Sequence, residues 1–107
     1  MTYQQKKVVV DALIGIASSS PTKKFLSNGY LQPSGKLEIS AQEFNIWIKY
    51  IESILDTLYE FIPLNTLLIT KIEIVNIATQ SNVSYLDQAL EIERKILNLA
   101  QGIAAST

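Results

Sequence analysis

Three acidic residues in the middle of the chain have a spacing that could place their carboxylates in one row. Glu52, Asp56 and Glu60 follow one another at intervals of four residues, which stacks side chains on one face of an α-helix. Such a row could contribute to a metal site, but metal sites in helical bundles normally add Glu-x-x-His pairs, and this chain has no histidine. The row falls opposite the apolar positions of the same stretch. We therefore interpret it as a solvated acidic face.

Lysines are concentrated in the N-terminal third of the chain. Residues 1–36 contain five lysines and a single acid, Asp11, although the whole chain has a formal net charge of −1. Beside Phe25 and Tyr30, these lysines could contact phosphates of single-stranded nucleic acid while the rings stack on its bases. Arginine, which nucleic-acid recognition prefers for its planar two-pronged contacts, is absent from this part, so nucleic acid is the alternative hypothesis. The candidate phosphate contacts are Lys6, Lys7, Lys23, Lys24 and Lys36.

The residue types that the chain lacks exclude several chemistries. Its 107 residues include no cysteine and no histidine, which excludes disulfide scaffolds, thiol nucleophiles, Cys/His zinc sites, Ser-His-Asp triads and histidine acid–base catalysis. No dinucleotide-binding glycine pattern, phosphate-binding loop or G-x-S-x-G turn occurs. We expect a protein that is not an enzyme and that binds neither a cofactor nor a metal.

The N-terminal residues imitate a secretory signal but depart from it at one position. Lys6 and Lys7 precede the apolar run 8–17, which Asp11 interrupts. A carboxylate in the centre of a membrane segment costs about 2.5–3.5 kcal/mol. Because the chain also contains no uninterrupted apolar run long enough to span a bilayer, we expect a cytoplasmic protein with no membrane partner. Asp11 is expected to face solvent.

Hydrophobic periodicity predicts one all-α domain over residues 1–107. Hydrophobic residues make up 48% of the chain and charged residues 18%, which is enough apolar material for a single core. A short extra helix is predicted near 21–27, and a loop or small β-hairpin at 30–39. The predicted architecture is a four-helix bundle with helices at about residues 4–18, 41–62, 64–80 and 85–103.

Capping residues and one proline predict where these helices begin and end. Ser40 and Glu43 form a capping-box pattern, and Ser84 begins a similar pattern before the last helix. Pro63 either ends the helix at 41–62 or opens the following one, because it lacks an N–H and clashes with a preceding turn.

Two further features are interpreted as parts of an ordinary helical fold. Trp47 lies beside the apolar positions of its helix and is expected in the core. A small-ligand pocket next to Trp47 is a less favoured alternative. The mixed charges of Glu91, Glu93, Arg94 and Lys95 point in different directions around the last helix, so we expect ordinary surface there.

The third predicted helix is apolar on nearly every side, and this carries the functional prediction. A chain of this size buries only about two-thirds of the surface that it exposes when unfolded, so covering every apolar face is difficult. We expect a non-catalytic helical interaction module, either a homodimer or a small subunit of a larger complex. The alternative is an accessory subunit of a nucleic-acid-containing complex that contacts phosphate through its N-terminal lysines. The expected apolar contact residues are Leu64, Leu67, Leu68, Ile69, Ile74, Ile77, Leu99 and Ile103.

Overall fold

A computed structural model describes residues 1–23 and 38–106, and the regular secondary structure in these ranges is helical. The model confirms the prediction of an all-α four-helix bundle. Four complete helices lie in the described ranges: α1 (Tyr3–Ser18), α3 (Ala41–Thr57), α4 (Leu64–Ala78) and α5 (Tyr85–Ala105).

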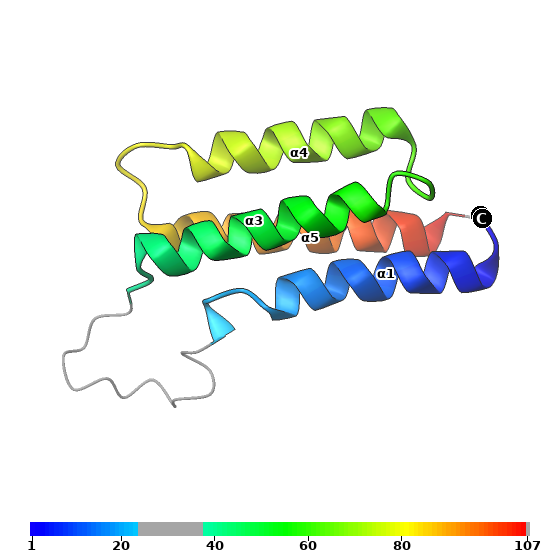
Figure 1. Ribbon diagram of the computed structural model, residues 1–107, viewed down its shortest axis with the longest axis horizontal. Helices are drawn as coiled ribbons and strands as arrows, with labels where there is room; N and C mark the ends of the chain where they lie inside the picture. Colours follow the sequence, from blue (N-terminus) through cyan, green and yellow to red (C-terminus); the bar gives the residue numbers. More distant parts are fainter. Residues whose placement is uncertain (24–37, 107) are drawn as a thin grey trace.

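The four helices form a bundle in which α3 and α5 lie between α1 and α4 (Figure 1). α1 packs most extensively on α5 and also contacts α3. α4 likewise packs mainly on α5, with a smaller contact to α3. Since α4 has its main neighbours on one side only, the opposite side of this helix faces away from the bundle.

The core runs along the inside of the bundle and takes one face from each helix. In α1 this face consists of Val9, Leu13 and Ile16, which are spaced at helical intervals and are fully buried. The periodic apolar positions of the other helices point inward in the same way. The remaining buried hydrophobic residues are Ala17, Ile39, Phe44, Trp47, Ile51, Leu55, Leu58, Ile62, Leu67, Ile74, Ile77, Ala89, Ile92, Ile96 and Ala100.

Side-chain caps fix the starts of three helices. The Ser40 hydroxyl accepts a hydrogen bond from the Glu43 backbone N–H at 3.1 Å, and the Glu43 carboxylate accepts one from the Ser40 N–H at 3.1 Å. Ser84 caps α5 through its hydroxyl, as predicted. Thr2 and Gln5 form a further capping box at the start of α1, which sequence reasoning had not identified.

α3 ends at Thr57, several residues before the predicted end at Pro63. The Thr57 hydroxyl donates to the Ile54 carbonyl at 2.6 Å and so competes for the acceptor that Leu58 would use in a continuing helix. The Leu58 N–H instead donates to a carbonyl three residues back, which tightens and ends the helix. Leu58 and Ile62 nevertheless remain buried, because the turns after α3 keep both side chains directed inward.

The other boundaries differ less from the prediction. Pro63 serves as the N-cap residue of α4. α4 ends at Ala78, before its predicted end at residue 80, and α5 ends at Ala105, after its predicted end at residue 103. The turn between α4 and α5 contains Asn82 in the left-handed region, with φ of 64°. Of the short helix predicted near 21–27, the part after Lys23 lies outside the described residues. The predicted loop or hairpin at 30–39 lies outside them except for its last two residues.

Candidate interaction surface

The predicted contact residues of α4 divide between two opposite faces of the helix. Three of them, Leu67, Ile74 and Ile77, are at most 5% exposed and belong to the core of the chain itself. This corrects the sequence-based expectation for these three, because side chains packed inside the bundle cannot meet a partner. Leu64, Leu68 and Ile69 are instead 46–62% exposed.

The exposed side of α4 forms a mostly apolar face. Ile72 and Val75, which share the helical stripe of Leu64 and Leu68, are 59% and 45% exposed. Sequence reasoning left these two out of the expected contact, although their spacing from Leu68 was visible. At 100° per residue, the exposed positions cover an arc of about 140° around the helix. We call this surface the outer face of α4 and define it as Leu64, Asn65, Leu68, Ile69, Ile72, Val75 and Asn76.

The charged residues of α4 lie at its two edges, where each pairs with a neighbouring helix. Lys71 pairs with Asp56 on α3. On the other edge, a Glu73 carboxylate oxygen lies 3.4 Å from the Lys95 ammonium on α5. Both pairs are partly exposed, so each contributes at most about 1 kcal/mol to stability. Because Lys71 and Glu73 are the only charged residues of α4, the outer face is uncharged.

Leu99 and Ile103 lie elsewhere, in a groove near the end of α5. Both side chains are partly buried against the core. They line a groove of about 540 Å³ together with Met1, Phe61 and neighbouring residues. The structure therefore brings these two predicted contact residues to a site beside the start of α4, separate from its outer face.

Among the described residues, the N-terminal lysines Lys6, Lys7 and Lys23 do not form one basic patch. The Lys6 ammonium donates to the Ser106 carbonyl at the end of α5, and the neighbouring Lys7 is exposed. The Lys23 ammonium lies 2.7 Å from a carboxylate oxygen of Glu93. Most of α1, about 18 Å of helix, separates Lys6 from the turn that leads to Lys23. Lys24 and Lys36 lie outside the described residues.

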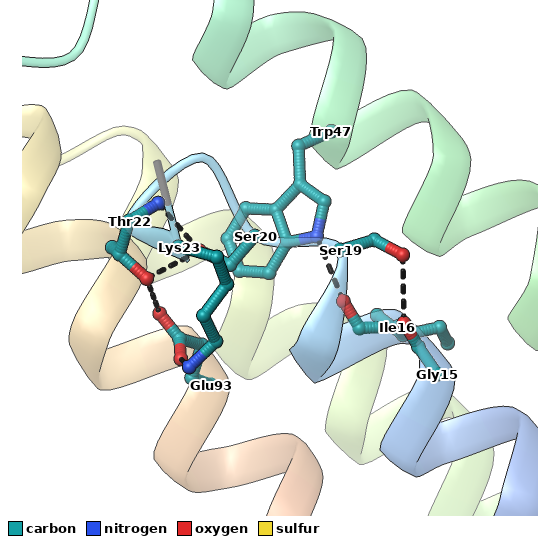
Figure 2. A network of polar contacts seen from close by, with 8 residues as sticks. All are labelled: Gly15, Ile16, Ser19, Ser20, Thr22, Lys23, Trp47 and Glu93. Carbon is teal, nitrogen blue, oxygen red and sulfur yellow. Dashed lines mark hydrogen bonds and ion pairs between the residues drawn. The ribbon is translucent and has the colours of Figure 1, made fainter. Parts of the chain in front are cut away.

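Glu93 is a buried carboxylate that joins α5 to the segment after α1 (Figure 2). It is 5% exposed. One carboxylate oxygen accepts a hydrogen bond from the Thr22 hydroxyl at 2.6 Å, and the other pairs with Lys23 at 2.7 Å. The Thr22 hydroxyl also lies 3.2 Å from the hydroxyl of Ser20, which is buried as well. This network connects the segment after α1 to the middle of α5.

The burial of Glu93 corrects the expectation that all charges in this stretch are ordinary surface. Glu93 follows Ala89 by four residues and precedes Ile96 by three, so it belongs to the buried stripe of α5. This spacing was visible in the sequence. The Thr22 and Lys23 partners were not, because their contact spans about 70 residues of chain. Arg94, next along the helix, is exposed as expected.

Trp47 is a core residue, which confirms the favoured interpretation. It is 3% exposed, and its indole N–H donates to the Ile16 carbonyl at 3.0 Å (Figure 2). The Ile16 carbonyl also accepts the Ser19 backbone N–H at 3.1 Å, so the indole is its second donor at the end of α1. The Ser19 hydroxyl donates to the Gly15 carbonyl at 2.8 Å in the same turn. A groove of about 300 Å³ beside Trp47 lies between the end of α1 and α3.

Glu52 and Asp56 on α3, Glu60 in the turn after α3, and Asp11 on α1 face solvent, as expected, although the end of α3 at Thr57 leaves Glu60 outside the predicted helical row. Glu52, Asp56 and Glu60 are exposed, and Asp56 is engaged by Lys71 of α4. Within residues 1–23 and 38–106, no three acidic side chains are grouped closely enough to hold a metal ion. Among the helices in these ranges, none combines the length and the apolarity needed to cross a bilayer.

The comparisons with known proteins add no assignment to this geometry. No protein-family model matches the chain, and no similar curated protein or solved structure was found.

Proposed function

We propose that this chain is a non-catalytic helical module for protein–protein interaction, acting in a homodimer or as a small subunit of a larger complex. The outer face of α4 is its binding surface. The observation that carries the proposal is the uncharged outer face itself, on which five large apolar side chains are 45–62% exposed. Single exposed apolar residues are common on protein surfaces, whereas a contiguous patch of this kind marks an interaction site.

The apolar area that a partner could cover is large for a chain of this size. Fully burying a Leu, Ile or Val side chain contributes about 1.5–3 kcal/mol. Roughly half of that contribution is still available at each of the five positions, which gives on the order of 5 kcal/mol for this chain's half of a complex. An interaction module that uses the outer face of α4 would therefore gain most of its affinity from apolar burial.

The contacts of the lysines support this proposal over the nucleic-acid alternative. Lys6 and Lys23 bond to groups within the chain and lie far apart, Lys6 near the start of α1 and Lys23 in the segment after it. Binding to a phosphate backbone requires several cations on one surface and weakens steeply with salt. The proposed apolar contact is expected to change little between low and high salt.

Site-specific photocrosslinking in the cells that make the protein tests the proposal. A photoreactive amino acid replaces Ile72 on the outer face of α4, and a matched control places it at the exposed Asp11 on α1, across the bundle. We expect a discrete protein adduct from position 72 and none from position 11. Equal labelling from both positions, or no adduct from position 72, would overturn the proposal.

A further inference from the structure

We infer that the partner of the outer face of α4 is a second copy of this chain, packed with the two α4 helices antiparallel about a twofold axis. This inference rests on the proposed function and names the partner. It goes beyond that function because it specifies the orientation and the register of the contact.

Charge complementarity favours a second copy. The edge charges of α4, Lys71 and Glu73, are already paired with Asp56 and Lys95 of the same chain. Two outer faces can therefore meet without bringing like charges together, and no unpaired charge on α4 calls for an acidic or a basic partner. A lipid surface fits less well, because helices that lie on membranes carry Lys and Arg along their polar edges.

The available burial agrees with a dimer of moderate affinity. Each copy contributes on the order of 5 kcal/mol of apolar burial, so the pair gains on the order of 10 kcal/mol. Association costs an estimated 4–15 kcal/mol in lost translational and rotational freedom, and the ordering of interface side chains adds to this cost. We therefore expect a reversible dimer with a Kd on the order of tens of micromolar or weaker.

Two asparagines in the outer face specify the register. Asn65 and Asn76 are both exposed and lie eleven residues apart. Eleven residues make about three helical turns, so both side chains lie on the same side of α4. A twofold axis midway between them places Asn65 of one copy opposite Asn76 of the other, and Ile69 opposite Ile72.

The chemistry of the amide fits this pairing. An asparagine amide both donates and accepts hydrogen bonds, so each Asn65–Asn76 pair can bond across the interface. Buried asparagines fix register and orientation in paired helices. Antiparallel packing also sets the positive end of each helix dipole beside the negative end of the other, which parallel packing does not.

The absence of cysteine from the chain makes cross-linking a clean test. We would prepare Asn65→Cys and Asn76→Cys as separate proteins and oxidise each alone and as an equal mixture. Arg94→Cys, with its thiol on the exposed side of α5, serves as the matched control. We expect a disulfide-linked species of twice 11.9 kDa in the mixture, and little in either variant alone or in the control. Far-ultraviolet circular dichroism confirms that each variant keeps its helical content.

Each other outcome overturns a defined part of the inference. Efficient linkage of Asn65→Cys to itself would show that the helices are parallel. A dimer by sedimentation that gives no linked species in the mixture would exclude the proposed register. A monomer at every concentration would exclude the second copy. In that case, an adduct from position 72 to a different protein would leave the proposed function standing, and the absence of any adduct would remove both.

Discussion

Breaking the buried Glu93 network has a predictable cost. In Glu93→Ala the Thr22 hydroxyl loses a charge-assisted hydrogen bond of 2.6 Å, and the Lys23 ammonium loses its 2.7 Å partner. A hydrogen bond to a charged group contributes about 1.5–3 kcal/mol when it is shielded from water. The Lys23 side chain is 42% exposed, so its pairing adds little. We expect the free energy of unfolding to fall by about 2 kcal/mol, which lowers the Tm of a domain of this size by about 8 °C.

A double-mutant cycle measures the Thr22–Glu93 contact directly. Urea unfolding of wild type, Thr22→Val, Glu93→Ala and the double variant gives the coupling free energy, expected at about 1.5 kcal/mol or more. Glu91→Ala is the matched control, because Glu91 is a partly exposed acid on the same helix whose contact to Arg94 is 3.8 Å long. All of these proteins, including the wild-type reference of the cycle, carry Ile72→Glu, so that association through α4 does not contribute to the measured stability.

Two results would contradict the assignment of Glu93 to a buried hydrogen-bonded network. If Glu93→Ala unfolds at the same urea concentration as Glu91→Ala, the carboxylate is not a buried network member. If the coupling between Thr22 and Glu93 is below about 0.5 kcal/mol, which is the level expected for independent surface sites, the hydrogen bond contributes nothing specific.

Three further predictions concern the two faces of α4, the start of α5 and the indole. Ile74→Ala is expected to lower the free energy of unfolding of the monomer by about 2–5 kcal/mol, and Ile72→Ala by less than about 0.5 kcal/mol. Similar losses for the two variants in urea unfolding would contradict the assignment of Ile74 to the core and of Ile72 to the outer face of α4. Ser84→Ala is expected to cost about 1 kcal/mol and Ser84→Gly a few tenths, so equal losses in thermal unfolding would argue against the cap. Trp47→Phe removes the indole donor from the Ile16 carbonyl, which keeps the Ser19 N–H, and is expected to cost about 0.5–1.5 kcal/mol for the lost hydrogen bond. Unchanged stability in urea unfolding would show that the bond is not made.

The helices were predictable because their signals are local. The buried stripe of Val9, Leu13 and Ile16 follows from helical periodicity. The cap at Ser40 follows from the glutamate three residues later, which completes a capping-box pattern. The end of α3 was misplaced for a local reason as well. Proline is a stronger and more familiar stop signal than the hydroxyl of Thr57, which competes with the backbone and ends the helix first.

The candidate surface was only partly predictable, because periodicity does not say which apolar face of a helix points inward. On α4 both faces are apolar, so Leu67 and Leu68 looked equivalent until the positions of α3 and α5 separated them. The pairing of Lys71 and Glu73 with neighbouring helices was also hidden. Contacts between residues distant in sequence depend on the tertiary arrangement, which the residue spacing along one helix does not predict.

Sedimentation equilibrium of the wild-type chain and of Ile72→Glu, with Asp11→Ala as control, tests whether the outer face of α4 joins two copies of the chain. The apparent mass of wild type and Asp11→Ala is predicted to rise from 11.9 kDa toward twice that value as concentration increases. Ile72→Glu is predicted to stay at 11.9 kDa, because a carboxylate in the apolar contact weakens association about a hundredfold or more. A wild-type chain that remains at 11.9 kDa throughout, or a dimer that Ile72→Glu leaves intact, would contradict this prediction.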